Sequence, residues 1–189
     1  MIEYVDVINE AGKIIDTMSR EDAYKKNCAL QVSGVLVFRS SGELLLQRRG
    51  KNKKYPLCYD YSAAGHVLSG ESFFQAAKRE LEEELGIFGA NLIKVGTVRA
   101  YNNDSTHSLR KLHQVFCAIN DDPINIYKEE LDGVDKFTEK QLDILVNDHP
   151  EKFTPTFIKV YREIIQPQAL FGNGIIKLQQ MKHVGRDDR

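Results

Sequence analysis

Three glutamates at helical spacing are the strongest chemical signal in this chain. Glu80, Glu83 and Glu84 stand at positions i, i+3 and i+4, and on a helix this spacing brings their side chains within about 5–6 Å of one another. Three carboxylates so close repel each other unless a cation lies among them, and clustered hard oxygen ligands suit Mg²⁺ or Mn²⁺. The spacing predicts a divalent metal site, and the alternative for such an acidic run alone is a solvated helix face.

The residues around the acids predict a helix that begins at Ser72 and ends before Gly86. Ser72 and Gln75 form a capping-box pair, and a glycine suits the position after the last helical turn. Apolar side chains then recur on one face, at Phe74, Ala77, Leu81 and Leu85. We expect the acids to lie on the opposite face, away from the core.

Residues 65–87 resemble the Nudix box, the signature of the Nudix hydrolases. The fixed positions of that signature are matched by Gly65, by Glu71 and by residues 79–87. A single short motif is weak evidence, but a match at every fixed position is specific. We therefore expect Glu80, Glu83, Glu84 and the backbone carbonyl of Gly65 to bind the metal. Arg79 can hold the carboxylates in place, and Glu71 can pair with Arg79.

The resemblance implies hydrolysis of a diphosphate linkage in a nucleoside diphosphate derivative or a related diphosphate. A bound Mg²⁺ would neutralise the phosphate oxygens and lower the pKa of a water molecule. The expected catalytic residues are Glu80, Arg79 and a general base. That base is either Glu83 or a carboxylate of a later loop, for which Glu129 and Glu130 are the candidates. Those two are otherwise exposed acids at the start of a strand.

Basic residues before the box could bind the phosphates of the substrate. Arg48 and Arg49 are the expected contacts, with Arg48 the stronger candidate. Lys51, Lys53 and Lys54 follow in a loop and are either further contacts or solvated side chains. Asp104 and His107 could line a pocket, but nothing in the sequence separates them from ordinary loop residues.

A closer resemblance is to the branch of Nudix proteins related to isopentenyl-diphosphate isomerase. Residues 44–49, 60–67 and the N-terminal segment carry it, and His66 stands where the isomerase has a metal ligand. The isomerase needs a cysteine just before the Gly-His pair, where this chain has Ala64, and residues 24–32 contain no histidine. The sequence therefore favours a hydrolase. A nucleotide-binding module without turnover is the second interpretation, and isomerisation is the third.

Composition excludes several other classes of protein. The 189 residues are 42% hydrophobic and 28% charged, with a net charge of −1, which is typical of one globular domain without a field that attracts nucleic acid or anionic membranes. No apolar run approaches the length of a membrane span, and residues 1–6 do not resemble a signal peptide. The three cysteines are widely spaced, so we expect free thiols and a cytoplasmic protein. The family also suggests a homodimer.

Strands and helices interleave along the chain, which predicts a mixed sheet covered by helices. The expected strands are residues 29–38, 43–47, 59–63, 92–101, 114–119 and 132–137. The expected helices are residues 72–85, 138–147 and 156–165. We predict an N-terminal hairpin and extension over residues 1–28, a Nudix domain over residues 29–165, and a C-terminal tail over residues 166–189. The fold class is α+β, and the Nudix resemblance implies an α/β/α sandwich.

Overall fold

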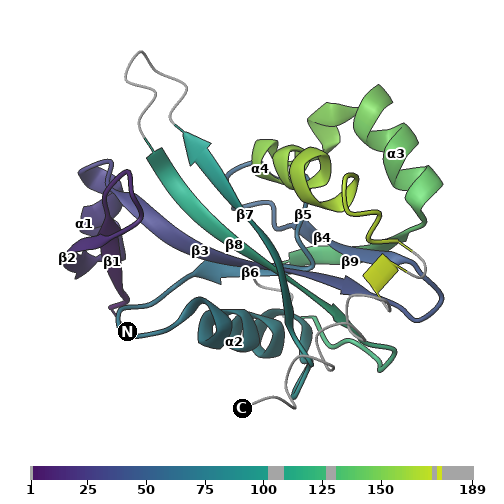
Figure 1. Cartoon of the computed structure of the whole chain (residues 1–189), viewed down its shortest axis with the longest axis horizontal. Coiled ribbons are helices and arrows are strands. Elements are labelled where there is room, and N and C mark those ends of the chain that lie inside the picture. The colour runs from purple at the N-terminus through teal and green to yellow at the C-terminus, as the bar shows by residue number, and fades with distance from the viewer. Residues whose placement is uncertain (1, 102–108, 127–130, 172–173, 176–189) are drawn as a thin grey trace, which may run out of the picture.

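A nine-stranded mixed sheet forms the centre of the molecule (Figure 1). The computed structural model describes residues 2–101, 109–126, 131–171 and 174–175. The strands are β1 (Tyr4–Ile8), β2 (Ile14–Ser19), β3 (Ala29–Phe38), β4 (Leu44–Arg49), β5 (Tyr59–Asp60), β6 (Ala63–His66), β7 (Ile93–Tyr101), β8 (Leu109–Ile119) and β9 (Leu131–Phe137). The helices are α1 (Arg20–Lys25), α2 (Phe73–Leu85), α3 (Glu139–Asp148) and α4 (Pro155–Val160), and α4 continues into a π-helical turn, Tyr161–Ile165.

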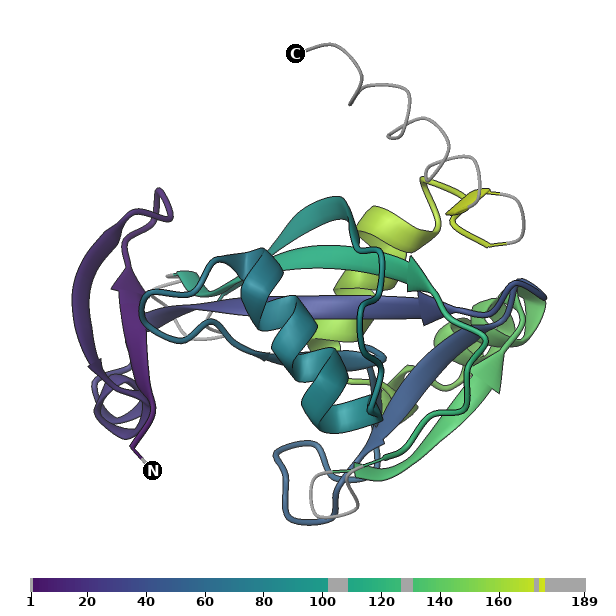
Figure 2. The same ribbon diagram turned by 90° about the horizontal axis from the view of Figure 1, so that it is seen from below.

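The long buried strand β3 organises the sheet. It pairs in parallel with β8 and antiparallel with β1, β4 and β6. Helix α2 covers one face, while α3 and α4 cover the other (Figures 1 and 2). Each face has its own buried apolar cluster, with Leu81 and Leu85 of α2 in one and Phe157 and Val160 of α4 in the other. These layers confirm the predicted α/β/α sandwich with a mixed sheet.

The N-terminal hairpin and α1 lie together at one end of the molecule (Figure 2). Strand β1 joins the sheet where Val7 pairs with Leu30 and Ile8 pairs with Ala29. Val5, Val7, Ala23 and Leu30 form a third small apolar cluster. The extension is thus attached to the start of β3 by both backbone pairing and apolar contact.

The single strand expected over residues 59–63 is wrong, because that segment changes partners. Residues Tyr59–Asp60 pair with β4, whereas Ala63–His66 pair with β3. The buried Ser62 lies at the break: its hydroxyl accepts a hydrogen bond from Val37 N at 2.7 Å and donates one to the carbonyl of Leu45. One side chain therefore satisfies backbone groups of both β3 and β4.

Helix α2 begins and ends as the sequence predicts. Ser72 is the N-cap, with both hydrogen bonds of the capping box to Gln75, and Gly86 adopts a left-handed conformation with φ of 64°. The predicted apolar face is wrong at Phe74, which is 41% exposed and packs edge-on against Phe116. Ala76 is buried instead of Phe74, because the buried stripe of α2 that faces the sheet begins at Ala76.

The chain beyond residue 165 contributes to the core. Leu170, Phe171 and Ile175 belong to the same buried cluster as α4. The predicted division between a domain and a tail at residue 165 stays a prediction. Cys28, Cys58 and Cys117 are free thiols, as expected. Among the described residues, no helix is both long enough and apolar enough to cross a membrane.

Candidate metal and diphosphate site

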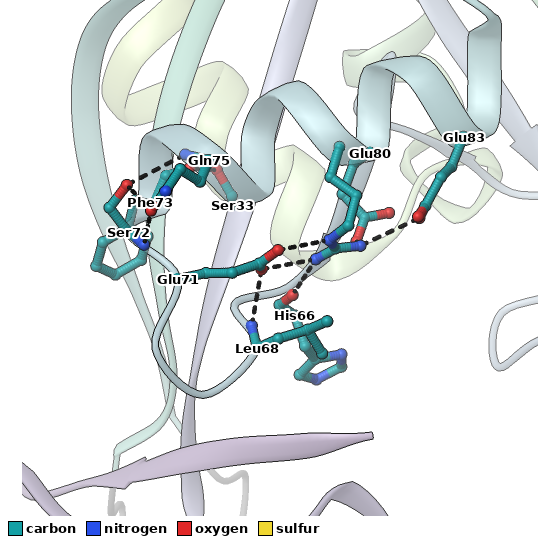
Figure 3. Close-up of polar contacts among 10 residues, drawn as sticks. Ser33, His66, Leu68, Glu71, Ser72, Phe73, Gln75, Glu80 and Glu83 are labelled. Carbon is teal, nitrogen blue, oxygen red and sulfur yellow. Dashed lines mark hydrogen bonds and ion pairs between the residues drawn. The ribbon is translucent and has the colours of Figure 1, made fainter. Parts of the chain in front are cut away.

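Arg79, in the middle of α2, is the centre of a polar network with Glu71, Glu80, Glu83 and His66, the four partners labelled in Figure 3. Its Nε and Nη2 donate to the two oxygens of Glu71 at 2.8 and 3.0 Å. Its Nη1 donates to Glu80 Oε1 at 2.6 Å and to Glu83 Oε2 at 3.1 Å. Its Nη2 also donates to the carbonyl oxygen of His66 at 2.9 Å. The predicted contacts of Arg79 with the carboxylates and with Glu71 are therefore present.

The charges of this network stabilise one another. Hydrogen bonding to Arg79 holds the pKa of Glu71 below its usual value, although burial opposes that shift. Burial disfavours the charge of Arg79, but the hydrogen bonds with Glu71 and the charge of Glu80 outweigh burial and raise its pKa. Glu71 also accepts a hydrogen bond from Leu68 N at 3.0 Å. The loop before α2 is thereby attached to the helix through Glu71 and Arg79.

Glu80 lies directly against Gly65 of β6. A Cβ atom added at Gly65 would collide with the carboxylate of Glu80. A side chain at residue 65 would therefore displace the Glu80 carboxylate from its place beside β6, and the glycine leaves room for it. The side chain and the backbone predicted to share a metal are neighbours in the structure.

Glu84 is held by a different part of β6. Its Oε2 accepts hydrogen bonds from Ala64 N at 2.9 Å and from Gln47 Nε2 at 3.2 Å. Gln47 is itself a buried side chain of β4. Its role was not predicted, and the only signal for it was a polar residue that follows three leucines.

The three glutamates do not all face away from the core, and that expectation is wrong for two of them. Glu80 and Glu84 are only 9% and 7% exposed, whereas the side chain of Glu83 is 60% exposed. Glu80 and Glu84 immediately precede Leu81 and Leu85, so they lie at the edge of the buried stripe beside β6. The site therefore has two buried carboxylates and one that is open to solvent.

The donor set fits a hard divalent cation. It consists of carboxylate oxygens beside a backbone strand, and such oxygens suit Mg²⁺. Within the described parts of the chain, however, no three acidic, histidine or cysteine side chains are already gathered into a ligand set. Nη1 of Arg79 lies between Glu80 and Glu83 instead. A cation would have to compete with Arg79 for these oxygens.

Arg48 and Arg49, which were predicted to bind phosphate, have different partners in the structure. Arg49 donates to Asp60 Oδ2 and to the carbonyl of Lys54, at 2.9 and 2.8 Å. Arg48 Nε lies 2.8 Å from Asp132 Oδ2, but its N–H makes no hydrogen bond within the described residues. Arg48 also lines a hollow of about 520 Å³. Arg49 is thus engaged in holding the loop after β4, and Arg48 is the more available of the two.

The imidazole ring of His66 and helix α2 lie on opposite sides of the loop that precedes α2 (residues 67–72, the box loop). Figure 3 shows its imidazole pointing away from the helix while its carbonyl oxygen meets Arg79. Nε2 of the imidazole is 3.0 Å from the hydroxyl of Tyr24, so His66 is a hydrogen-bonding partner of α1. No pattern in the sequence indicated this contact of Tyr24. Glu129, Glu130, Asp104 and His107 lie outside the described residues.

Known proteins are similar to this chain in both sequence and fold. Residues 30–158 match the NUDIX domain. The chain is 29% identical over 160 residues to an uncharacterized Nudix hydrolase of Yersinia pestis, covering 84% of each protein. It is 33% identical over 130 residues to an uncharacterized Nudix hydrolase of Pseudomonas aeruginosa, covering 68% of this chain and 75% of that one.

Solved structures agree with the sequence matches. The protein DR0079 of Deinococcus radiodurans has a TM-score of 0.71 at 21% identity, over 85% of this chain and 98% of that chain. A MutT NUDIX hydrolase of Burkholderia pseudomallei has a TM-score of 0.55 at 22% identity, over 68% of this chain and 92% of that chain. These likenesses show the fold, and the domain match shows the family. The chain therefore belongs to the Nudix hydrolases and is a pyrophosphohydrolase.

Proposed function

We propose that this protein is a Mg²⁺- or Mn²⁺-dependent hydrolase of a diphosphate linkage in a nucleoside diphosphate derivative or a related small diphosphate. The observation that carries this proposal is the pair of buried carboxylates, Glu80 and Glu84, held beside Gly65 and Ala64 of β6. Acids at so little exposure need compensation by positive charge. Arg79 supplies part of it, and a cation bound by Glu80, Glu83, Glu84 and the carbonyl of Gly65 would supply the rest.

When bound, the metal would offset the negative charge of the diphosphate and lower the pKa of water. The chain's own residues would do the remaining work. In this proposal Glu83, the exposed acid of the three, would accept the proton of the attacking water. Water adds to one phosphorus, the bridging P–O bond breaks, and the other phosphate leaves with the bridging oxygen. Glu130 is the alternative base, and Arg48 the proposed phosphate contact.

Glu71 and Arg79 act in this scheme as positioning residues. Arg79 hydrogen-bonds both the helix acids and the carbonyl of His66, so it fixes α2 relative to the loop that contains Gly65. Partners that orient metal ligands typically influence activity by about 10–100-fold when they are removed. The proposal assigns them that role without direct contact with the substrate.

Membership of this chain in the isopentenyl-diphosphate-isomerase-like branch stays a proposal. Isomerisation itself is disfavoured because Ala64 stands where the isomerase has a cysteine. A binding module without turnover is the other alternative. A cytoplasmic location, a homodimer and the absence of nucleic-acid or membrane partners belong to the same proposal.

The decisive experiment is a panel of diphosphates incubated with the protein and Mg²⁺. Nucleotide sugars, dinucleotides, flavin nucleotides, nucleoside triphosphates and isoprenyl diphosphates are assayed by phosphorus NMR. We expect phosphate-ester products that disappear with EDTA and return with Mn²⁺. Glu83→Gln should lose about 100-fold or more in kcat, because a general base is removed.

Glu82→Gln is the matched control, since Glu82 lies on the same helix and, among the described residues, forms no hydrogen bond or ion pair with the Arg79 side chain. It should keep wild-type activity. Full activity of Glu83→Gln would contradict the role given to Glu83. Thermal stabilisation by a panel member without any product would favour the binding module, and proton exchange into an isoprenyl diphosphate would favour the isomerase.

A further inference from the structure

A second polar cluster lies across the box loop from α2, and the proposed chemistry does not use it. Its centre is Tyr24 of α1, whose ring is 39% exposed. Arg110 and Lys111 of β8 lie over this ring, with the guanidinium carbon and Nζ at 5.2 and 5.7 Å from its centroid. The ring of His66 meets Tyr24 edge-on at 5.6 Å. Three elements that are distant in sequence thus meet around one aromatic side chain.

Arg110 and Lys111 give the cluster positive charge. Neither forms an ion pair with a carboxylate of the described residues. Arg110 donates instead to the carbonyl of Cys28 at 2.6 Å, which fixes its guanidinium beside α1. Both cations lie within about 6 Å of the centre of the Tyr24 ring.

His66 contributes to the cluster through its ring. Nε2 of the imidazole lies 3.0 Å from the Tyr24 hydroxyl, and the ring packs edge-on against Tyr24. His66 therefore holds the Tyr24 side chain in place beside Arg110 and Lys111.

The cluster adjoins the proposed metal site through a single residue. The carbonyl of His66 accepts from Arg79, while its ring contacts Tyr24. Strands β6 and β8 flank β3, where His66 and His113 both pair with Val32. Lys111 precedes His113 by two positions on β8 and therefore points to the same side of the sheet. The end of β6, at His66, therefore lies between the proposed metal site and the cluster.

We propose that Tyr24, Arg110 and Lys111 form a subsite for a second anionic group, a phosphate monoester carried by the part of the diphosphate substrate that is not attacked. This inference rests on the proposed function and narrows its substrate class. Arg110 supplies a fork of donors and Lys111 a point charge, both suited to phosphate oxygens. Because Tyr24 comes from α1, the N-terminal extension becomes a specificity element of the enzyme.

The test compares substrates that differ by one phosphate: NADH with NADPH, and dephospho-coenzyme A with coenzyme A. We expect the wild type to show a KM about tenfold lower for the phosphorylated member of a pair. Lys111→Met and Arg110→Met should remove most of that difference while kcat changes less than about twofold. Lys26→Met is the control, because Lys26 is an exposed lysine of the same extension and should keep the preference.

A binding measurement separates this proposal from the hydrolase proposal. Calorimetry with inorganic phosphate in EDTA should detect binding to the wild type and to Lys26→Met, and about tenfold weaker binding to Lys111→Met. This result supports the subsite even if no panel member is hydrolysed. Equal phosphate binding by the wild type and Lys111→Met, or hydrolysis with unchanged preference in that variant, would overturn the subsite. Lys111→Met decides the matter if Arg110→Met fails to fold, because among the described residues the Lys111 side chain lies against the Tyr24 ring and forms no ion pair.

Discussion

At the scale of single residues, Arg79 joins Glu71 to Glu80 and Glu83, and two of the helix acids, Glu80 and Glu84, are buried beside β6. The contacts of Arg79 with Glu71, Glu80 and Glu83 follow from helical spacing and the box pattern. The burial of Glu80 and Glu84 does not, because acids are normally read as the solvent side of an amphipathic helix. The missing information was that β6 approaches the edge of the stripe, where Gly65 leaves room for the carboxylate.

His113 gives a residue-scale prediction about pH. Burial, followed by the charge of Lys111, lowers the pKa of His113 from 6.5 to about 3. The unfolded chain keeps an ordinary pKa of about 6.5, so between these values it binds a proton that the folded state does not. Stability must then fall as the pH drops below about 6.5. Between about pH 8 and about pH 5, protonation of His113 in the unfolded chain should lower the free energy of unfolding by about 2 kcal/mol.

The measurement is urea unfolding of the wild type and of His113→Gln at both pH values. The variant can be less stable overall, but its loss between the two pH values should be about 2 kcal/mol smaller. His149→Gln is the control, because the side chain of His149 is 52% exposed, and it should lose as much as the wild type. An identical pH dependence in all three proteins would show that His113 is not held neutral by the fold.

At the scale of elements, the apolar patterns located β3 and α2 well and failed where a segment changes partners. Residues 59–63 look like one strand because they alternate, yet the chain passes from β4 to β3 within them. Strand pairing is a tertiary property that local periodicity does not contain. The residue that makes the crossing possible, Ser62, has no distinctive pattern around it.

Ser62→Ala should destabilise the junction between these strands. The change leaves the N–H of Val37 and the carbonyl of Leu45 without their buried partner, and each such loss costs about 1–3 kcal/mol. We expect a decrease of about that size in the free energy of unfolding, measured in urea. Ser40→Ala, in an exposed turn, should change it by less than about 0.5 kcal/mol. Equal stability of the two variants would show that water replaces the lost hydroxyl.

At the scale of the whole molecule, the interleaved elements predicted a mixed sheet covered by helices, and the Nudix resemblance implied the sandwich. The ends of the chain were the least predictable part. The N-terminal hairpin was predicted, but its contact with the box loop through Tyr24 and His66 was not, since no local signal links α1 to β6. The C-terminal segment was predicted to be a tail because it contains Gly172 and Gly174 and ends in the charged residues 185–189. The burial of apolar residues in such a terminal segment can be recognised only when the core against which they pack is known.

Leu170→Ala tests whether the folding unit extends past residue 165. Leu170 is fully buried among residues of the α4 side of the sheet, so its truncation should lower the free energy of unfolding by about 2–5 kcal/mol. The same substitution at Leu57, which is 45% exposed, serves as the control and should cost less than about 1 kcal/mol. Urea unfolding followed by circular dichroism measures both. If Leu170→Ala behaves like Leu57→Ala, the segment contributes little to stability, and a domain that ends at residue 165 is the better description. If the larger loss is found, residues 166–171 belong to the cooperative core. A cavity in a segment that packs only transiently would not lower the free energy of global unfolding.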